Sequence, residues 1–235
     1  MKKTTKSTNV RGLHFVLFLA VSGLYFLPLK THAQVFNISA DESVIKILVY
    51  RQGILSVFGH DHVIVSKNVT GTVTVDENHI DESRAQLKIP VNTLIVDDPI
   101  YRQEEGGGFT KKISPQDAQD TRNEMLSKNV LDGKRYPDIE IRTKSISGQL
   151  PNLTVKADFM LHGVTKEFNL PVTAELNKQQ LLANGKFVIS QKNFGITPLN
   201  ILLGTISVKD DVLIKYKISA KIPESKVDGD KTGTK

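Results

Sequence analysis

The chain has 235 residues, of which 39% are hydrophobic, 24% are charged and 6% are aromatic, and it contains no cysteine. This length and apolar content support a hydrophobic core and exclude a largely disordered chain. The absence of cysteine excludes disulfides, a thiol nucleophile and cysteine-ligated metal sites. Of the 31 basic residues, five lie in residues 1–33, which hold no acidic residue, so the remainder has 26 basic against 25 acidic side chains. A nearly neutral remainder without a basic stripe argues against a nucleic-acid partner.

The first 33 residues have the three-part pattern of a secretory signal peptide. A cationic start precedes the apolar run 13–29, and Thr31 and Ala33 supply small residues before a cleavage point. An uncleaved membrane anchor is the alternative, although 17 residues are few for a span, which usually needs about 20 apolar residues. We therefore expect residues 1–33 to be removed. The mature chain would then be periplasmic or secreted, and not an integral membrane protein.

From Gln34 onward, apolar and polar residues alternate in many short runs that are rich in β-branched side chains. This period of two is typical of strands with one buried and one wet face, as in antiparallel sheets. Eight to ten such strands with short connections favour an all-β barrel or sandwich. The expected strands are 43–50, 69–75, 83–91, 138–144, 153–161, 167–174, 185–190 and 205–220.

Residues 97–137 interrupt the strands. Ser114 followed by Pro115 is a good helix start, with serine as N-cap and proline in the first turn. Apolar residues at helical spacing follow, so we expect one short helix that lies over an open end of the barrel. The domain would span residues 34–222, and the polar tail 223–235 would be unstructured. The apolar positions of the expected helix are Ala118, Met125, Leu126 and Val130.

His60 and His62 are the most suggestive pair for a metal site. If residues 55–65 form a strand, the two imidazoles lie on one face, about 6–7 Å apart. That spacing suits two ligands of a divalent zinc or iron ion, with a third ligand from elsewhere. The alternative is that the two histidines only fix local structure through hydrogen bonds. The candidates for the third ligand are His79, His162, Asp210 and Asp211.

Other polar groups have simpler interpretations. The pair His162-Gly163 between two apolar runs predicts a tight hairpin turn. The acid pairs 97–98 and 104–105 have no base or nucleophile beside them, so we interpret them as part of a solvated loop. No phosphate loop, nucleophile elbow or zinc-protease motif occurs. We therefore predict a protein that is not an enzyme and needs no cofactor, apart from the divalent metal considered above.

Four stretches together resemble the YceI-like family of exported lipid-binding proteins. They are VLDGKRYPDIEI at 130–141, LTVKADF leading to LHGVTK at 153–166, GKF and QKNFGI within 185–196, and VKDDV at 208–212. These stretches follow the order of the family, and the resemblance extends over about residues 35–222.

The resemblance implies an extended, lipocalin-like antiparallel β-barrel of about eight strands that holds an isoprenoid or other lipid-like amphiphile. A homodimer is compatible with this sequence as well. The rival hypotheses are a metal-dependent binder or enzyme that uses His60 and His62, and a structural envelope protein whose barrel is filled by its own side chains. Strand parity gives the residues expected to line a ligand cavity: Ile45, Ile47, Leu87, Ile89, Ile139, Ile141, Phe159, Leu161, Phe187 and Ile189.

Overall fold

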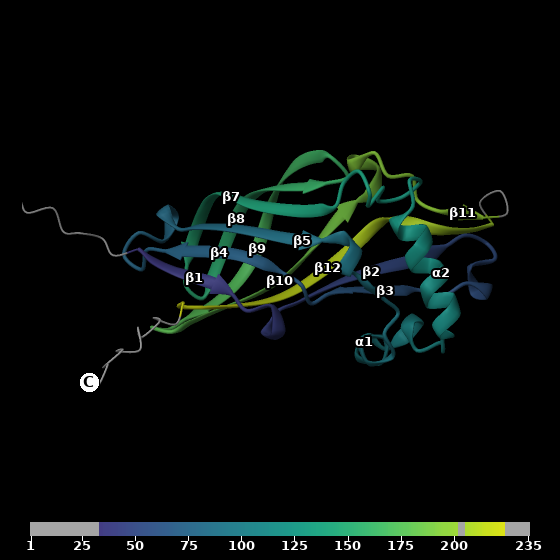
Figure 1. Ribbon diagram of the computed structural model, residues 1–235, viewed down its shortest axis with the longest axis horizontal. Coiled ribbons are helices and arrows are strands. Elements are labelled where there is room, and N and C mark those ends of the chain that lie inside the picture. The colour runs from purple at the N-terminus through teal and green to yellow at the C-terminus, as the bar shows by residue number, and fades with distance from the viewer. Residues whose placement is uncertain (1–32, 202–204, 224–235) are drawn as a thin grey trace, which may run out of the picture. The chain divides into compact units, whose positions relative to one another are not determined.

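The computed structural model describes residues 33–201 and 205–223 (Figure 1). Within these residues lie twelve strands and two α-helices, together with short 3₁₀ turns. The strands are β1 (Gln34–Ile38), β2 (Val44–Gln52), β3 (His62–Ser66), β4 (Thr70–Val75), β5 (Arg84–Pro90), β6 (Ile95–Val96), β7 (Asp138–Gln149), β8 (Asn152–Leu161), β9 (Val164–Leu176), β10 (Gln180–Ser190), β11 (Asn200–Ile201) and β12 (Ile206–Lys221), and the helices are α1 (Pro99–Glu105) and α2 (Pro115–Leu126).

Eight antiparallel strands close into a barrel in the order β1-β4-β5-β7-β8-β9-β10-β12. The ring closes because the last residues of β12 pair with β1, where Ala220 lies opposite Ile38. Closure removes the free edges that an open sheet would expose. The predicted all-β, lipocalin-like barrel is thereby confirmed, and so is the expected number of barrel strands.

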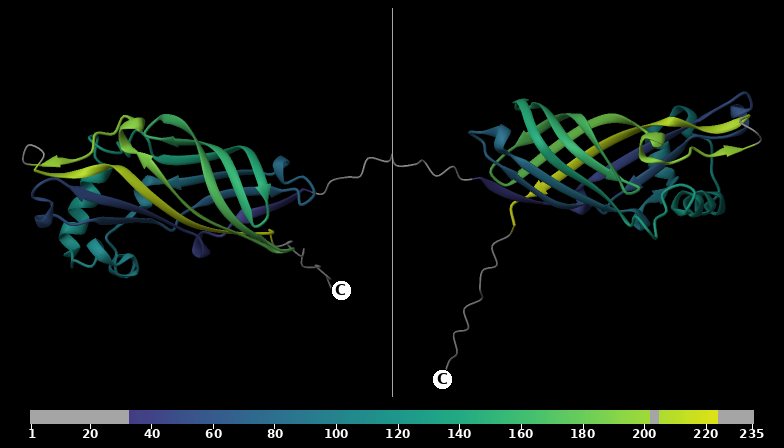
Figure 2. Two further views of the ribbon diagram at one scale, coloured as in Figure 1. Left: turned by 180° about the vertical axis from the view of Figure 1, so that it is seen from behind. Right: turned by 90° about the horizontal axis from the view of Figure 1, so that it is seen from above.

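The remainder of β12 pairs with β2 instead of β1, from Ser207 to Lys217. The strands β3 and β6 continue the sheet from β2. As Figure 1 shows, this extension forms the end of the barrel at which α1 and α2 lie. At the end with the helices, β2, β3 and β6 therefore continue the sheet from β12 in place of β1, and Figure 2 shows the same arrangement from two further sides.

Strands β9 and β10 pair only over a short ladder, from Leu181 opposite Leu176 to Asn184 opposite Thr173. Beyond this ladder, the carbonyl of Pro171 accepts a hydrogen bond from the hydroxyl of Tyr216 at 2.8 Å. Burial raises the pKa of Tyr216 to about 12, so the hydroxyl keeps the proton that it donates. The hydroxyl of Tyr216 thus supplies the carbonyl of Pro171 with a hydrogen bond at a point where β9 and β10 no longer pair.

The eight predicted strand ranges all fall on strands, but the structure corrects three other predictions. Residues 55–65 are not one strand, because β3 begins only at His62 and Ser56–Phe58 form a 3₁₀ turn. The segment 97–137 holds two helices rather than one. The second starts as expected, since the Ser114 hydroxyl accepts from the backbone N–H of Asp117, but it ends at Leu126 and leaves Val130 outside.

The predicted turn at His162 and Gly163 is confirmed. Both residues have positive φ, 52° and 75°, as a two-residue hairpin turn that follows the twist of its strands requires. The predicted signal peptide and tail lie outside the described residues, apart from Ala33 and Pro223. No helix in the described part of the chain is long and apolar enough to span a bilayer.

Helix α1 is fastened to the barrel by Glu105, which the sequence analysis placed in a solvated loop. Its side chain is only 4% exposed, and its carboxylate oxygens lie 2.5 Å from the Nζ atoms of both Lys46 on β2 and Lys215 on β12. Burial alone would raise the pKa of Glu105, but the hydrogen bonds from Lys215 and Lys46 hold it below its usual value. Glu105 therefore stabilises the fold as a carboxylate.

Replacing Glu105 with glutamine should lower the free energy of unfolding by about 1–3 kcal/mol, because two charge-assisted hydrogen bonds lose their charged acceptor. Glu104 offers a matched control, since its side chain is half exposed and, among the described residues, forms an ion pair with Lys46 alone, at 3.3 Å. Glu104→Gln should cost less than about 1 kcal/mol. Urea unfolding of the three proteins at pH 7 measures both values, and equal losses in the two variants would contradict this role of Glu105.

The same contact predicts a pH dependence. Because the folded-state pKa of Glu105 lies below its ordinary value of 4.5, its contribution is fully present above that value. The contribution should be lost as the pH falls through the lower folded-state pKa. The difference in unfolding free energy between the wild type and Glu105→Gln should accordingly shrink on acidification below pH 4.5, and a constant difference would count against the proposed charge state.

Candidate functional site

The interior of the barrel holds an apolar cavity of about 160 Å³, here named the inner cavity. Alternate residues of the barrel strands point into it, as the period of two requires. Its polar lining within the described residues is limited to Tyr216 and three small hydroxyl side chains, Ser66, Ser83 and Thr143. The Ser83 and Thr143 hydroxyls each accept a backbone N–H at 3.1 Å, whereas the fully buried Ser66 hydroxyl has no partner.

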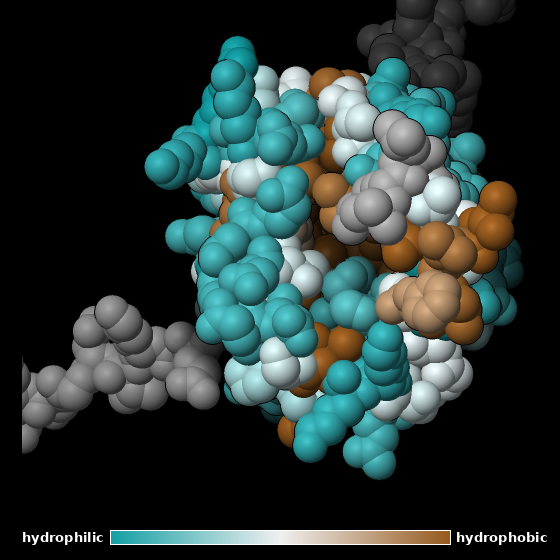
Figure 3. Space-filling view, turned by 90° about the vertical axis from the view of Figure 1, so that its right-hand side faces the viewer, coloured by the Kyte–Doolittle hydropathy of each residue, from teal (hydrophilic) through white to brown (hydrophobic). Residues whose placement is uncertain are grey.

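A second cavity of about 200 Å³, here named the outer cavity, adjoins the first on the side of α2. Both cavities are bordered by the same four side chains, those of Ile47, Ile139, Phe159 and Ile214. The outer cavity is less apolar than the inner one. The surface at this end is hollowed, with hydrophobic residues at the bottom of the hollow (Figure 3). The polar residues that line the outer cavity are His62, Thr121, Glu124 and Gln191.

The structure brings all ten residues expected from strand parity to the walls of these cavities. Leu161 and Ile189 line the outer cavity alone, while Ile47, Ile139 and Phe159 line both. Contact with a ligand stays a prediction for each of them. The remaining five line the inner cavity: Ile45, Leu87, Ile89, Ile141 and Phe187.

Sequence reasoning missed the far half of the inner cavity. The same alternation continues along β8 through Leu153 and Val155 and along β12 through Ile218, and all three residues line it. The period-two signal was present in these strands, so parity alone could have found them. The cavity therefore extends further from α2 than the ten predicted residues indicate.

A buried carboxylate organises the polar edge of the outer cavity. Asp97 follows β6 with φ of 56°, and its side chain is fully buried. Its Oδ2 atom lies 2.6 Å from Nδ1 of His62, while Oδ1 accepts from the backbone N–H of Val63 at 3.0 Å and from Nη1 of Arg102 at 2.5 Å. Although burial alone would raise the pKa of Asp97, these contacts, the one from His62 foremost, hold the pKa below its usual value.

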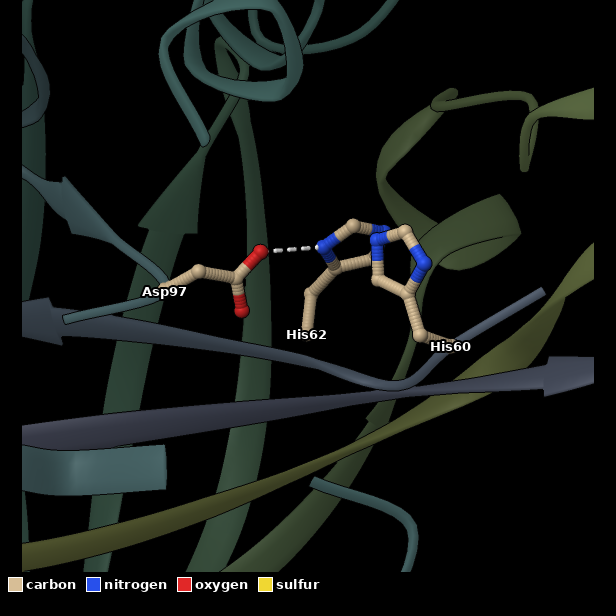
Figure 4. Close-up of side chains that lie close together, drawn as sticks. All are labelled: His60, His62 and Asp97. Atoms are coloured by element: carbon tan, nitrogen blue, oxygen red, sulfur yellow. Dashed lines mark hydrogen bonds and ion pairs between the residues drawn. The ribbon is translucent and has the colours of Figure 1, made fainter. Parts of the chain in front are cut away.

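His60 lies directly beside this group. The rings of His60 and His62 meet edge to face, with centroids 4.5 Å apart (Figure 4). The Nε2 atom of His60 is buried and has no hydrogen-bond partner. Burial and the neighbouring His62 lower the pKa of His60 to about 4, so this imidazole is neutral near pH 7.

The third polar group of this cluster is Asp97, which the sequence analysis placed in a solvated loop. One atom from each of the three side chains lies within 4.8 Å of the others. Asp97 lies 35 residues after His62 in the sequence. The pairing of β6 with β3 brings its side chain next to the two histidines. Four other residues were expected as the third ligand, and none of them belongs to a described cluster with the two histidines: His79, His162, Asp210 and Asp211.

The comparisons with known proteins agree with the barrel. A family model described as the YceI-like domain matches residues 36–220. The chain belongs to the YceI-like family. The resemblance inferred from the four sequence stretches is thus confirmed, and the proteins of this family are β-barrel proteins.

Among solved structures, BcnA from Burkholderia cenocepacia matches this YceI-like chain with a TM-score of 0.57 and 16% identity. The match covers 78% of this chain and 99% of that chain. A YceI protein from Campylobacter jejuni matches with a TM-score of 0.48 and 15% identity over 67% of this chain and 83% of that chain. At 16% identity the likeness to BcnA concerns the fold alone. A search of curated proteins finds no match.

Replacing Asp97 with asparagine should lower the free energy of unfolding by about 3–5 kcal/mol, the usual cost of removing one partner of a buried ion pair. The neighbouring Asp98 is a matched control because its carboxylate caps α1 by accepting from the backbone N–H of Ile100. Asparagine caps helices about as well as aspartate, so Asp98→Asn should change stability by less than about 0.5 kcal/mol. Urea unfolding separates the two outcomes, and a small loss in Asp97→Asn would refute the organising role of Asp97.

Proposed function

We propose that this YceI-like protein is exported and binds an isoprenoid or another lipid-like amphiphile inside its barrel. The observation that carries the proposal is the pair of adjoining cavities, about 160 and 200 Å³, within an almost wholly apolar bore. Engineered apolar cavities of about 150 Å³ remain dry and bind small apolar molecules. Closed barrels of eight strands are wide enough to hold one small ligand.

The energetics suit an apolar chain rather than a charged molecule. Each methylene group removed from water contributes about 0.8 kcal/mol, so a long tail binds without a charged anchor. A charged group in the inner cavity would lose its hydration and find only hydroxyl groups, at a cost of several kcal/mol. We therefore assign the apolar tail of the ligand to the inner cavity.

The polar end of the amphiphile would lie in the outer cavity. Glu124, Thr121 and Gln191 line that cavity near α2 and supply both donors and acceptors. The ligand would enter at this end, with its tail directed towards β1. The unpartnered hydroxyl of Ser66 marks a point inside the bore where an ether or carbonyl oxygen of a ligand, or a water molecule, would gain a hydrogen bond.

Filling the inner cavity should weaken ligand binding. Ala183 on β10 lines this cavity, and a phenylalanine in its place would occupy volume that the ligand needs. Val188 on the same strand is 52% exposed, so Val188→Phe adds the same ring outside the barrel. Displacement of the dye 1-anilinonaphthalene-8-sulfonate by the isoprenoid alcohol farnesol measures the affinity of each protein.

We expect Ala183→Phe to lower the farnesol affinity at least tenfold, and Val188→Phe to bind like the wild type. Thermal unfolding of both variants confirms that each is folded. If farnesol fails to displace the dye from the wild type, or if all three proteins bind equally, the cavity is not the binding site. A solid barrel with a structural role would then be the better account.

A further inference from the structure

The proposed binding of an apolar chain does not account for the cluster of His60, His62 and Asp97, and the hydrogen bonding of this cluster is incomplete. The buried Nε2 atom of His60 has no partner in the structure. A buried polar atom without a partner has lost its hydrogen bonds to water and gained none in the protein, so it lowers the stability of the fold. A group that satisfies this nitrogen would therefore be bound with a gain in stability.

The hydrogen bond to Asp97 determines which nitrogen of His62 is free. Asp97 is held as a carboxylate by Arg102 and can only accept, so Nδ1 of His62 carries the proton in this contact. In the neutral imidazole, Nε2 then has the lone pair. A carboxylate that accepts from the far nitrogen of a histidine is the usual outer partner of a metal-binding imidazole.

The two imidazoles face each other closely enough to share one ion. Their ring centroids are 4.5 Å apart, the rings lie beside each other in Figure 4, and one nitrogen of each ring lies within 4.8 Å of the other. In a metal site each nitrogen would lie about 2.0–2.1 Å from a zinc ion, so the two rings would rotate out of their edge-to-face contact when the ion binds. His62 also lines the outer cavity, so the remaining positions around the ion are open to water or to an oxygen atom of a ligand.

We propose that His60 and His62 bind a divalent transition-metal ion of the zinc class through one nitrogen each. Imidazole donors favour zinc, copper, nickel and iron over calcium or magnesium. Asp97 is already paired with Arg102, so the site has little net negative charge to attract hard cations such as calcium.

The test uses the untagged chain after treatment with a chelator. Titration with Co²⁺, followed by visible absorption, reports nitrogen ligation directly, and calorimetry with Zn²⁺ gives the stoichiometry. We expect one ion per chain in the wild type, with the affinity lowered at least tenfold in His60→Ala and in His62→Ala. His79→Ala is the matched control, because the His79 side chain is 53% exposed and lies outside the cluster, and it should bind like the wild type.

Absence of saturable Co²⁺ and Zn²⁺ binding by the wild type would overturn the metal site, whatever the stability of the variants. Unchanged affinity in both His60→Ala and His62→Ala would overturn it too. A result of this kind would leave the cluster as a purely structural contact. Neither outcome depends on whether the barrel binds an amphiphile.

A separate observation concerns the loop between β2 and β3, here named the apolar loop and comprising residues 53–59. Ile54 is 91% exposed and Phe58 is 70% exposed, and Leu55 and Val57 are exposed beside them. Single exposed apolar residues are common, but four within five positions of one loop form a patch that calls for a partner.

The apolar loop lies next to the outer cavity. The backbone N–H of Leu55 donates to the carbonyl of Thr205, the residue before β12, at 2.9 Å. Val208 of β12 and Leu199, the residue before β11, both line that cavity. In the space-filling view, hydrophobic residues protrude beside the hollow at this end (Figure 3). A partner that covers the loop would thus come close to the opening through which we expect the ligand to pass.

Basic side chains lie at the base of the loop. Nζ of Lys111 donates to the carbonyl of Phe58 at 3.3 Å, and Nη1 of Arg51 donates to the carbonyl of Gly59 at 3.2 Å. Apolar residues at the tip with cations behind them match the layering of a bilayer whose headgroups are anionic. We infer that the apolar loop docks on an anionic lipid surface, an inference that rests on the proposed function because such a surface is where an amphiphile resides.

Sedimentation with vesicles tests the docking without any isoprenoid present. The wild type should sediment with vesicles of equal parts phosphatidylglycerol and phosphatidylcholine and much less with phosphatidylcholine alone. The double variant Ile54→Ser, Phe58→Ser should bind the anionic vesicles at least fivefold more weakly. Val188→Ser, which removes an exposed apolar residue from β10, should bind like the wild type.

A wild type that stays in the supernatant, or a double variant that sediments equally well, would overturn the docking. A protein partner for the loop would then be the remaining explanation of its exposure. Farnesol displacement in the double variant keeps the two proposals apart, because the loop residues do not line either cavity and their loss should leave that affinity unchanged.

Discussion

Closure of the sheet between β12 and β1 is the constraint on which the rest of the structure depends. In a closed ring every second residue of each strand faces the interior. Apolar side chains at these positions stabilise the barrel because closure removes them from water. The inward positions of the strands hold apolar residues almost throughout the interior of the barrel. Because the inward side chains leave two cavities between them, the same alternation that stabilises the barrel also creates the binding space.

No described residue that lines the inner cavity is charged, whereas several buried charged side chains lie at the end with the helices. There β12 leaves β1 and pairs with β2, and the sheet continues into β3 and β6. This extension brings Asp97 against His62 and Arg102, and it brings Glu105 of α1 against two lysines of the barrel. The helices are thus attached through buried carboxylates, while the bore below them remains apolar. An amphiphile has the same division between a polar end and an apolar tail.

The fold could be predicted from the sequence where the signal is periodic and long. All eight strands with clear alternation were found, and β7, β9 and β10 proved longer than expected. The strands β1, β3, β6 and β11 span two to five residues, too few for a period of two to stand out. Helix α1 was missed although Asp98 and Pro99 repeat the capping signal of Ser114 and Pro115, because its seven residues carry no clear apolar periodicity.

The candidate site likewise has a part that the sequence predicts and a part that it does not. The cavity residues follow from strand parity, and all ten predicted positions line the two cavities. Asp97 could not be predicted, because its burial and its contacts arise only when β6 pairs with β3. In the sequence it is one of two adjacent aspartates, and local pattern does not distinguish the buried Asp97 from the half-buried Asp98 that caps α1. Long-range pairing decides their roles.

The central claim is that the barrel carries an apolar-tailed molecule, and mass spectrometry of the bound material tests it most directly. The chain would be purified without detergent and measured intact under native conditions, and its organic extract would then be analysed. The account predicts a stoichiometric long-chain isoprenoid or lipid in the extract and the matching mass increase on the intact protein. A protein of bare mass with an empty extract, which also takes up no such molecule when incubated with membrane lipids, would contradict it.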